Sequence, residues 1–499
     1  MTTPSDAHHA GEGDMSSIPG TTRRTALTVL GATTVGASLM GGGPVGAAQA
    51  AGTTHLRLRF SDANGNAMGL AAVRSIQSHG LGEVGYDDAL LDSSTLEVVA
   101  IAPLYQDESG AISLDAPTGR SCTLTMSWPT SHGYSALMVD LPASGEVEVM
   151  EAAARSLHSR QEARAAGVSD AALASARATT GAELTACQKA ASATQRGAHA
   201  VRALESASTA QLALDGALST TAPGDSVLGV TFTRPPSSAE ASGLAGRLGG
   251  AGRTAVRIVV EDPGDAAAMA QWRGAVTTLQ AQGIRVVGQI CDSRIMAGLD
   301  DAAWDRRVST LLTGLPGLET WEIGNELGGN WLGASPLPRI IRAAKAVRQR
   351  TKATTLLTLY YQLGLDSAEH SVFNTARAVA ASELAGLVDV VGLSVYPQWH
   401  PLGTAADRVL SALAATFPKA RTAVTELGYG GPSLSGPWWF GSKTDVAAGR
   451  RAVIDHITKA ALGRPGAWGA PFWWYYLEDE APGAVGGPVQ PTLARLKPA

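Results

Sequence analysis

The second half of the chain shows a regular alternation of short apolar runs and longer amphipathic stretches, and this feature restricts the fold most. Eight apolar runs follow one another between residues 226 and 499. Helix-forming stretches separate them, which is the pattern of βα units that build a parallel sheet. Eight such units in about 250 residues are typical of a TIM (β/α)8 barrel. The expected strands are 227–233, 255–260, 284–290, 319–324, 355–360, 388–395, 421–425 and 470–475.

We therefore predict an α/β fold with a (β/α)8 barrel over residues 224–499. A doubly wound sheet is the alternative for such an alternation. Its first βα turn would carry a glycine-rich fingerprint. The turn here is Thr233-Arg234-Pro235-Pro236 and contains no glycine, which favours the barrel.

The region before the barrel divides into two parts with different composition. Residues 53–150 hold six or more short strand-like runs separated by turn residues such as Asp62-Ala63-Asn64-Gly65. They predict a small β-sandwich-like domain. Residues 151–220 are rich in alanine and contain no proline. They predict helices, arranged as a linker or as a hairpin.

Residues 1–50 have the pattern of an export signal. Arg23 and Arg24 precede a weakly apolar stretch that glycine and threonine dilute, and Ala48-Gln49-Ala50 ends it. A charged segment, a short apolar segment and small residues at a cleavage site are typical of secretion. The paired arginines favour a twin-arginine signal peptide, with an ordinary signal peptide or an unstructured tail as alternatives. We expect a secreted, extracellular protein that begins at Ala51.

Composition excludes several classes of protein. Hydrophobic residues make up 45% of the 499-residue chain and charged residues 17%, which is enough apolar material for a large core. The net charge of −5 does not favour a nucleic-acid partner. No long apolar run follows residue 52, so no membrane insertion is expected. Three cysteines cannot build a disulfide scaffold, and their spacing fits no metal site.

Two glutamates stand where a barrel enzyme carries its catalytic groups. Catalytic residues of such barrels lie at the carboxyl ends of the strands. Glu326 follows the fourth expected strand and Glu426 ends the seventh, 100 residues later. They therefore face each other across one barrel mouth. Two facing carboxyls are what glycoside hydrolysis needs, because one protonates the leaving oxygen and the other attacks the anomeric carbon.

Other strand ends supply groups that suit a sugar. Asn325 is a neutral hydrogen-bond donor beside Glu326. Tyr396, Trp399 and Trp474 offer apolar ring faces for stacking. A single glutamate at a strand end is more often a solvated loop residue, so the prediction depends on the joint pattern.

Three motifs resemble the clan A retaining glycoside hydrolases. The resemblance implies that Glu326 is the acid/base and Glu426 the nucleophile, and that Arg257 and Tyr396 match the substrate-binding arginine and tyrosine of the clan. The motifs of the sixth and seventh strands are nearest to the endo-β-1,4-galactanases, whereas the paired tryptophans and tyrosines of the eighth strand depart from that pattern. The motifs are Ile323-Gly324-Asn325-Glu326, Val391-Gly392-Leu393-Ser394-Val395-Tyr396-Pro397 and Val424-Thr425-Glu426-Leu427-Gly428-Tyr429.

The sequence thus predicts a secreted retaining glycoside hydrolase. We expect it to cleave β-glycosidic bonds of a polysaccharide by double displacement, with endo action, as a monomer without cofactor or metal. Its partner would be a polysaccharide or oligosaccharide. The alternative is a non-catalytic carbohydrate-binding or cell-wall-associated protein on a degenerate barrel. A metal-dependent hydrolase is disfavoured, because the expected strand ends carry almost no histidine.

Overall fold

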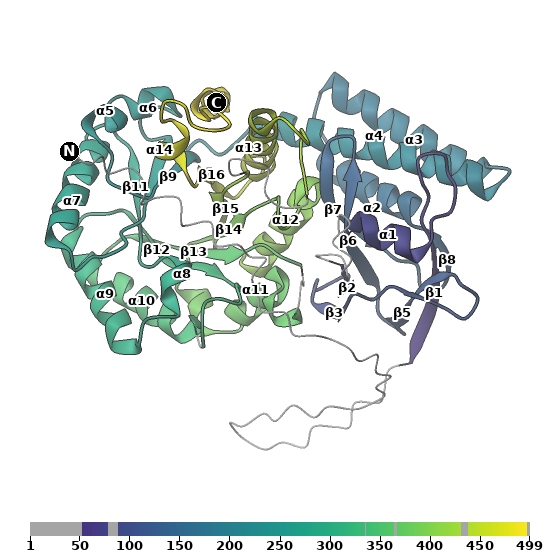
Figure 1. The fold of residues 1–499 in the computed structure, drawn as a ribbon, viewed down its shortest axis with the longest axis horizontal. Helices are drawn as coiled ribbons and strands as arrows, with labels where there is room; N and C mark the ends of the chain where they lie inside the picture. Colours follow the sequence, from purple (N-terminus) through teal and green to yellow (C-terminus); the bar gives the residue numbers. More distant parts are fainter. Residues whose placement is uncertain (1–51, 78–87, 335, 364–366, 431–437, 497–499) are drawn as a thin grey trace, which may run out of the picture. The chain divides into compact units, whose positions relative to one another are not determined.

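The computed structural model describes residues 52–77, 88–334, 336–363, 367–430 and 438–496 (Figure 1). The predicted signal peptide lies outside these residues. Residues 51–499 form one compact unit. Among the described helices, none combines the length and the apolar composition that crossing a bilayer requires.

Eight parallel strands close into a barrel, in the order β10-β11-β12-β13-β14-β15-β16-β9. The first strand closes the ring by pairing with the last, with Leu228 opposite Ala470. The predicted TIM barrel is therefore confirmed, and the expected strands differ from the observed ones by a few residues at their ends. The strands are β9 Val227–Phe232, β10 Thr254–Ile258, β11 Arg285–Gln289, β12 Thr320–Leu327, β13 Thr354–Tyr360, β14 Val390–Val395, β15 Arg421–Leu427 and β16 Ala467–Trp473.

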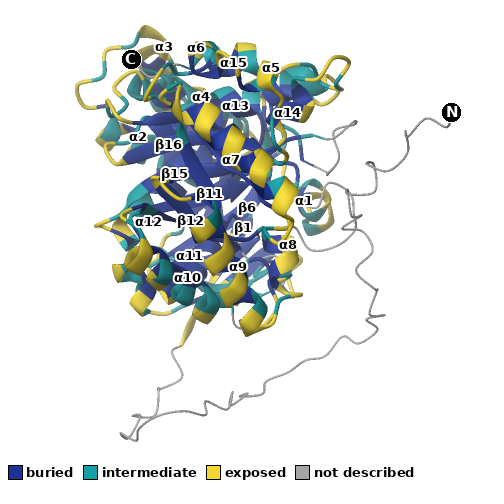
Figure 2. Cartoon of the chain, turned by 90° about the vertical axis from the view of Figure 1, so that its left-hand side faces the viewer, coloured by how far each residue is buried: buried dark blue, intermediate teal, exposed yellow. Residues whose placement is uncertain are grey.

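Helices surround the barrel and leave their polar faces in solvent, as Figure 2 shows for α7, α9 and α10. Aspartates begin several of them. Asp265 caps α7 by accepting hydrogen bonds from the backbone N–H groups of Ala267 and Ala268, which the first helical turn cannot satisfy itself. The main helices are α7 Ala266–Gln280, α9 Asp301–Gly314, α10 Pro336–Arg350, α11 Val372–Ala380, α12 Ala406–Thr416 and α13 Val446–Leu462.

Side chains alternate along each barrel strand between the helices and the interior, as the strand period of two requires. On β13, Leu357 and Leu359 belong to the core between strands and helices, while Leu356 belongs to a separate apolar cluster. This second cluster fills one end of the barrel interior. All its members except Phe472 are among the first three residues of their strands. The members are Val227, Ala255, Val287, Leu356, Val390, Ala423, Trp468 and Phe472.

Two four-stranded sheets precede the barrel, with the orders β4-β5-β1-β8 and β3-β2-β6-β7. Leu56 and Leu114 from the first sheet share a hydrophobic core with Leu124 and Val139 from the second. The β-sandwich-like domain expected in the fold class is thereby confirmed. The strands are β1 Thr53–Arg59, β2 Ala89–Asp92, β3 Val98–Ile101, β4 Tyr105–Gln106, β5 Ile112–Pro117, β6 Cys122–Thr130, β7 Gly133–Asp140 and β8 Gly145–Glu148.

The alanine-rich segment forms three long helices, α2 Val149–Arg164, α3 Ala171–Lys189 and α4 Ala193–Ser219. α4 packs against both other helices and against α13 of the barrel. The segment is thus a packed helical layer, although the domain boundaries expected at residues 150 and 220 stay predictions. A short helix that the sequence did not indicate, α1 Leu70–Gln77, also lies in this region.

The amino-terminal part and the barrel share polar and apolar contacts. Arg164 of α2 forms ion pairs with Asp215 of α4 and with Asp407 of α12, at 3.3 and 2.6 Å. The start of β7 pairs with the segment that precedes α13, because the Tyr134 N–H donates to the Trp439 carbonyl at 2.7 Å. The amino-terminal part is therefore packed against the barrel and is not joined to it by a flexible linker alone.

Candidate active site

Glu426 at the barrel mouth accepts hydrogen bonds from three donors. It is the sixth residue of β15, and 2% of it is exposed. Its Oε2 accepts from Arg257 Nη2 at 2.8 Å and from Asn325 Nδ2 at 3.0 Å, and its Oε1 accepts from the Tyr396 hydroxyl at 2.5 Å. Three donors from three other strand ends match a carboxylate, which only accepts. They also hold the side chain in one orientation.

Glu326 lies in a different environment. The hydroxyls of Ser293 and Ser394 hydrogen-bond to its two oxygens at 2.5 and 2.7 Å, and no cation pairs with it among the described residues. Burial, and next the negative charge of Glu426, raise the pKa of Glu326 to about 8. Glu326 therefore keeps its proton at neutral pH, as a general acid must.

A β-bulge on β12 aims three polar side chains at the interior. The pairing of β12 with β13 shifts between Glu322 and Gly324 and again between Gly324 and Leu327. Gly324 faces outward, since a Cβ there would lie 2.6 Å from Ile340 Cδ1 on α10. Glu322, Asn325 and Glu326 can then all face inward despite their irregular spacing. Glu326 itself has a φ of 53°, a strained value for a residue other than glycine.

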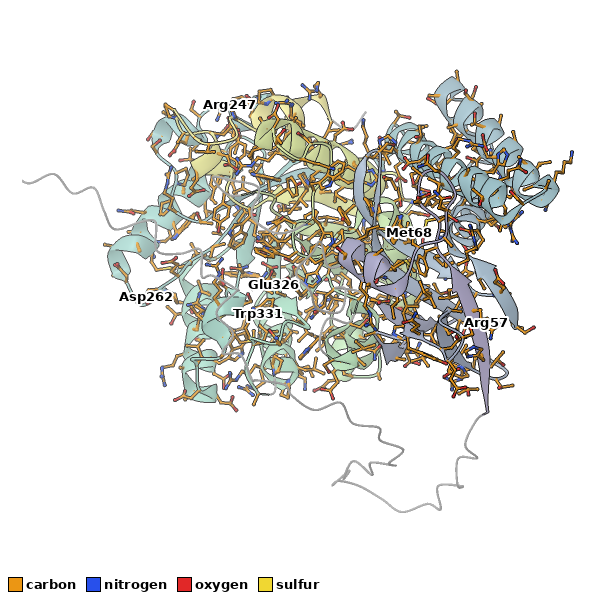
Figure 3. All side chains as sticks on the ribbon, turned by 45° about the vertical axis from the view of Figure 1, so that its right-hand side comes forward. Arg57, Met68, Arg247, Asp262, Glu326 and Trp331 are labelled. Atoms are coloured by element: carbon orange, nitrogen blue, oxygen red, sulfur yellow. The ribbon has the colours of Figure 1, made fainter. Side chains whose placement is uncertain are left out.

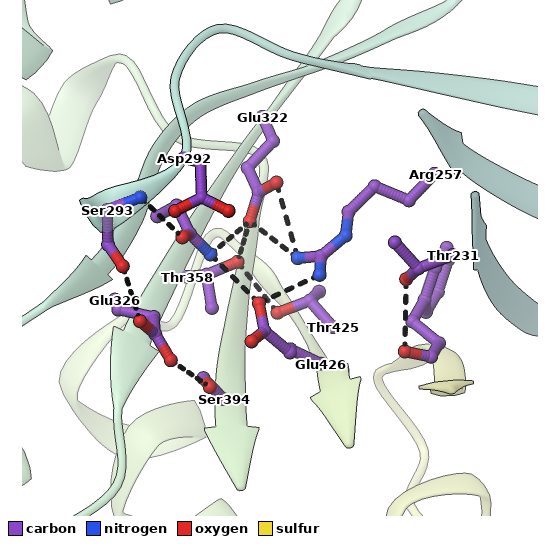
Figure 4. A network of polar contacts seen from close by, with 12 residues as sticks. Thr231, Arg257, Asp292, Ser293, Glu322, Glu326, Thr358, Ser394, Thr425 and Glu426 are labelled. Atoms are coloured by element: carbon purple, nitrogen blue, oxygen red, sulfur yellow. Dashed lines mark hydrogen bonds and ion pairs between the residues drawn. The ribbon is translucent and has the colours of Figure 1, made fainter. Parts of the chain in front are cut away.

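The two glutamates belong to one connected group of polar residues (Figure 4). Ser394 on β14 lies opposite Glu426 in the pairing with β15, and its hydroxyl reaches Glu326. Asn325, next to Glu326 in the chain, hydrogen-bonds to Glu426. The predicted meeting of strands 4 and 7 at one mouth is thereby found in the structure. A protonated carboxyl and a carboxyl that only accepts hydrogen bonds, together at one mouth, are the pair that acid and nucleophile chemistry needs.

Arg257 lies deeper than the sequence suggested. We expected it among the substrate-binding residues, but its side chain is 1% exposed and bonds to Glu426 and Glu322. The Trp474 ring packs on it, with the guanidinium carbon 4.7 Å from the ring centroid. Arg257 therefore holds the carboxyls of Glu322 and Glu426 in place from inside the barrel.

The predicted stacking aromatics differ in exposure. Trp474 is 6% exposed, and its neighbour Tyr475 is 40% exposed. Tyr396 and Trp399 are half-buried at and after the end of β14. Which aromatic of the eighth strand stacks on a sugar stays a prediction.

Sequence reasoning missed Ser293 and Trp331. Trp331 is half-buried and donates from Nε1 to the Ser293 hydroxyl at 3.0 Å, so the two residues together support Glu326. Figure 3 shows Trp331 and Glu326 close together in the barrel. Ser293 lies three residues after the third expected strand, 284–290, so it could have been found by including the residues that follow that strand.

Other residues at the mouth have structural partners. Asp292 caps the short helix α8 Ser293–Met296 by accepting from the Arg294 N–H. His400 is buried, with its ring 5.5 Å from that of Tyr360. Cys291, like the other two cysteines of the described chain, is buried and free. Among the described residues, no group of histidine, cysteine, aspartate and glutamate is arranged to hold a metal ion.

No protein-family model and no curated protein matches this chain. Solved structures that resemble it are glycoside hydrolases. A fungal β-1,4-galactanase is 14% identical, with a TM-score of 0.39, over 54% of this chain and 98% of its own. A GH113 β-1,4-mannanase is 11% identical, with a TM-score of 0.37, over 54% and 98%. A glycoside hydrolase family 5 enzyme of Prevotella bryantii B14 is 13% identical, with a TM-score of 0.34, over 56% and 96%.

Proposed function

We propose that this protein is a secreted retaining glycoside hydrolase that cleaves β-glycosidic bonds in a polysaccharide. Glu326 acts as the acid/base and Glu426 as the nucleophile. The observation that carries the proposal is the contrast between the two carboxyls. Glu426 accepts from three donors, while burial and the nearby charge raise the pKa of Glu326 to about 8.

In the first step, a carboxylate oxygen of Glu426 attacks the anomeric carbon of the bound sugar. Glu326 gives its proton to the glycosidic oxygen, and the bond between that oxygen and the anomeric carbon breaks. The products are a free alcohol and a glycosyl ester on Glu426. Arg257, Asn325 and Tyr396 keep Glu426 in the attacking orientation through their three hydrogen bonds.

In the second step, Glu326 is a carboxylate and takes a proton from a water molecule. The water oxygen attacks the anomeric carbon, and the ester bond to Glu426 breaks. Glu326 regains its proton and Glu426 its negative charge, so the cycle closes. Two displacements at one carbon retain its configuration.

Aromatic side chains around the mouth support a substrate of several sugar units. Tyr475, Trp399 and Trp331 are partly or largely exposed and come from loops after three different strands. Spread stacking platforms suit an extended chain, so endo action is the expected mode. Export rests on the paired arginines and the small-residue cleavage site of residues 1–50.

A panel of β-linked polysaccharides and aryl β-glycosides tests the proposal, with Glu426→Ala as the inactive control. Release of reducing ends by the wild-type protein, lost in the variant, supports it. Binding of a polysaccharide without hydrolysis by the wild type would favour the non-catalytic alternative. Amino-terminal sequencing of the exported protein tests secretion, and we expect it to begin at Ala51.

A further inference from the structure

A third carboxyl lies beneath the two glutamates of the mouth. Glu322 on β12 is 0% exposed, so no substrate in the mouth can reach it. Burying a carboxylate is costly unless charges and hydrogen bonds compensate it. We therefore expect the buried Glu322 carboxyl to have a role other than packing.

Donors surround both oxygens of Glu322. Arg257 Nη1 lies 3.2 and 3.4 Å from Oε1 and Oε2, and Asn325 Nδ2 lies 3.4 Å from Oε1. The Thr358 hydroxyl also donates to Oε1. Burial raises the pKa of Glu322 above its usual value, and the charge of Arg257 and the Thr358 hydrogen bond offset part of that rise. A set made only of donors fits the ionised form.

The same donors serve Glu426. Arg257 bonds Glu322 through Nη1 and Glu426 through Nη2, and Asn325 Nδ2 contacts both carboxyls. Both donors to Glu426 Oε2 therefore also bond to Glu322, and Figure 4 shows Arg257 between the two carboxyls. A second link runs from Glu322 through the Thr358 hydroxyl to that of Thr425, 2.8 Å away and next to Glu426 in the chain.

Two carboxylates thus share one buried cation. Among the described residues, the groups that act on the Arg257 guanidinium include Glu322, Glu426, Tyr396, Asp292 and the Trp474 ring. Without the charge of Glu322, the whole positive charge of Arg257 would act on Glu426. That would stabilise the ground-state carboxylate and weaken it as a nucleophile, because a charge in a dry site acts strongly.

We propose that Glu322 is a positioning residue for the nucleophile. It holds Arg257 and Asn325 in place for Glu426, and its negative charge limits how far Arg257 neutralises that carboxylate. This inference rests on the proposed role of Glu426.

The test compares Glu322→Gln and Glu322→Asp with the wild type in the full chain. Glu319→Gln is the matched control, because Glu319 is exposed just before the same strand. For Glu322→Gln we expect kcat on an activated aryl glycoside to fall about 10- to 100-fold with KM changed less than about threefold. The acidic limb of the kcat/KM profile should move to lower pH by about one unit. Glu322→Asp keeps the charge and should restore the position of that limb.

A second measurement does not depend on finding a substrate. In protein labelled with carbon-13 at the glutamate carboxyls, the signal of Glu426 is the one lost in Glu426→Gln. Glu322→Gln should move the titration of this signal to lower pH, and Glu319→Gln should leave it in place. An unchanged titration and acidic limb in a folded Glu322→Gln protein would overturn the inference. Full activity of Glu426→Ala would instead overturn the proposed function, whatever Glu322 does.

Discussion

Several barrel strands contribute to two unlike layers of the same interior. Ala255 and Arg257 both face inward from β10, only two residues apart, and Leu356 and Thr358 do so from β13. The first member of each pair belongs to the apolar cluster at the amino-terminal end of the strands. The second belongs to the polar network around Glu322 and Glu426.

The two layers serve opposite needs. The apolar layer packs side chains such as Trp468 and Phe472, whose rings stack 5.6 Å apart, and it contributes to stability through buried area. The polar layer buries several charged groups and a strained backbone at Glu326, which cost stability unless each is compensated. We infer that the apolar layer at one end of the barrel interior stabilises the fold. The polar layer at the other end carries the catalytic groups. Substitutions in the two layers should therefore separate activity from stability.

The largest effect is expected from Glu426→Ala. Removing the attacking carboxylate should lower kcat by about 10³-fold or more on every substrate. The variant keeps Glu322 as the partner of Arg257 but leaves one donor of Arg257 and one of Asn325 without their carboxylate, so its thermal midpoint should fall while the protein stays folded at the assay temperature. Steady-state kinetics and thermal unfolding of the same preparation check both statements. A loss of activity that merely parallels unfolding would contradict the separation of layers.

Glu326→Ala should have a substrate-dependent effect. Natural polysaccharides need their leaving oxygen protonated, so kcat should fall about 10²- to 10⁴-fold on them. Aryl glycosides with a good leaving group need little protonation, so the rate of their first step should fall far less. Kinetics on a series of aryl glycosides with leaving groups of graded acidity measure this. Equal losses across the series would argue against the acid/base role.

Leu356→Ala probes the opposite layer. Leu356 is 0% exposed in the apolar cluster, and its truncation leaves a cavity. We expect the free energy of unfolding to fall by about 2 to 5 kcal/mol. Because the Leu356 side chain is apolar and belongs to the opposite end of the interior, kcat of the folded fraction should remain near the wild-type value. Urea unfolding and kinetics at a temperature well below the midpoint provide the comparison.

The protonated state of Glu326 should affect stability with a definite sign. Folding raises its pKa from 4.5 to about 8, so the folded state binds the proton more tightly. The free energy of unfolding should then fall as pH rises from about 4.5 to 8 through this group. Glu326→Gln removes that dependence, so the variant should gain about 5 kcal/mol over the wild type at pH 9 and little at pH 4. Urea unfolding at pH 4, 7 and 9 tests the trend, and a gain at pH 4 alone would contradict it.

The smallest expected effect is on the basic limb of the kcat/KM profile against pH, whose position depends on the Glu326 proton. Since Glu326 must be protonated to act as an acid, kcat/KM should decline above about pH 8. The optimum therefore extends to neutral pH. In Glu326→Gln this limb should vanish, and its persistence would assign the acid to another residue.

The barrel and its two glutamates could be predicted because they depend on local pattern. Alternating runs give the strands, and the ends of parallel strands meet at one mouth, which brings Glu326 and Glu426 together without further information. The inward orientation of Asn325 beside Glu326 depends on a feature that the sequence pattern does not show. A period of two puts Glu322, Gly324 and Glu326 on one side of an unbroken strand, and only the bulge on β12 turns Gly324 outward and lets Asn325 face inward.

Contacts distant in the chain were equally hidden from the sequence. Tyr134 pairs with Trp439 across about 300 residues, and a Cβ at Gly133 would lie 2.5 Å from Phe440 Cα. Such an approach leaves no periodic signal, because it depends on how two separately formed elements dock. From the sequence alone, the aromatic run 438–440 fits both a substrate platform and loop packing. The structure buries Trp438 and Phe440.

The central claim is that Glu426 bonds covalently to the sugar during turnover, and trapping that bond tests it most directly. Wild-type protein and Glu426→Ala would be treated with 2-deoxy-2-fluoro-β-glycosides of several sugars that carry an activated leaving group. These reagents slow the second displacement more than the first. The account predicts a mass increase of one fluorosugar on the peptide that contains Glu426, and none in the variant. Labelling of a different residue, or turnover that releases the inverted anomer without any adduct, would contradict the account.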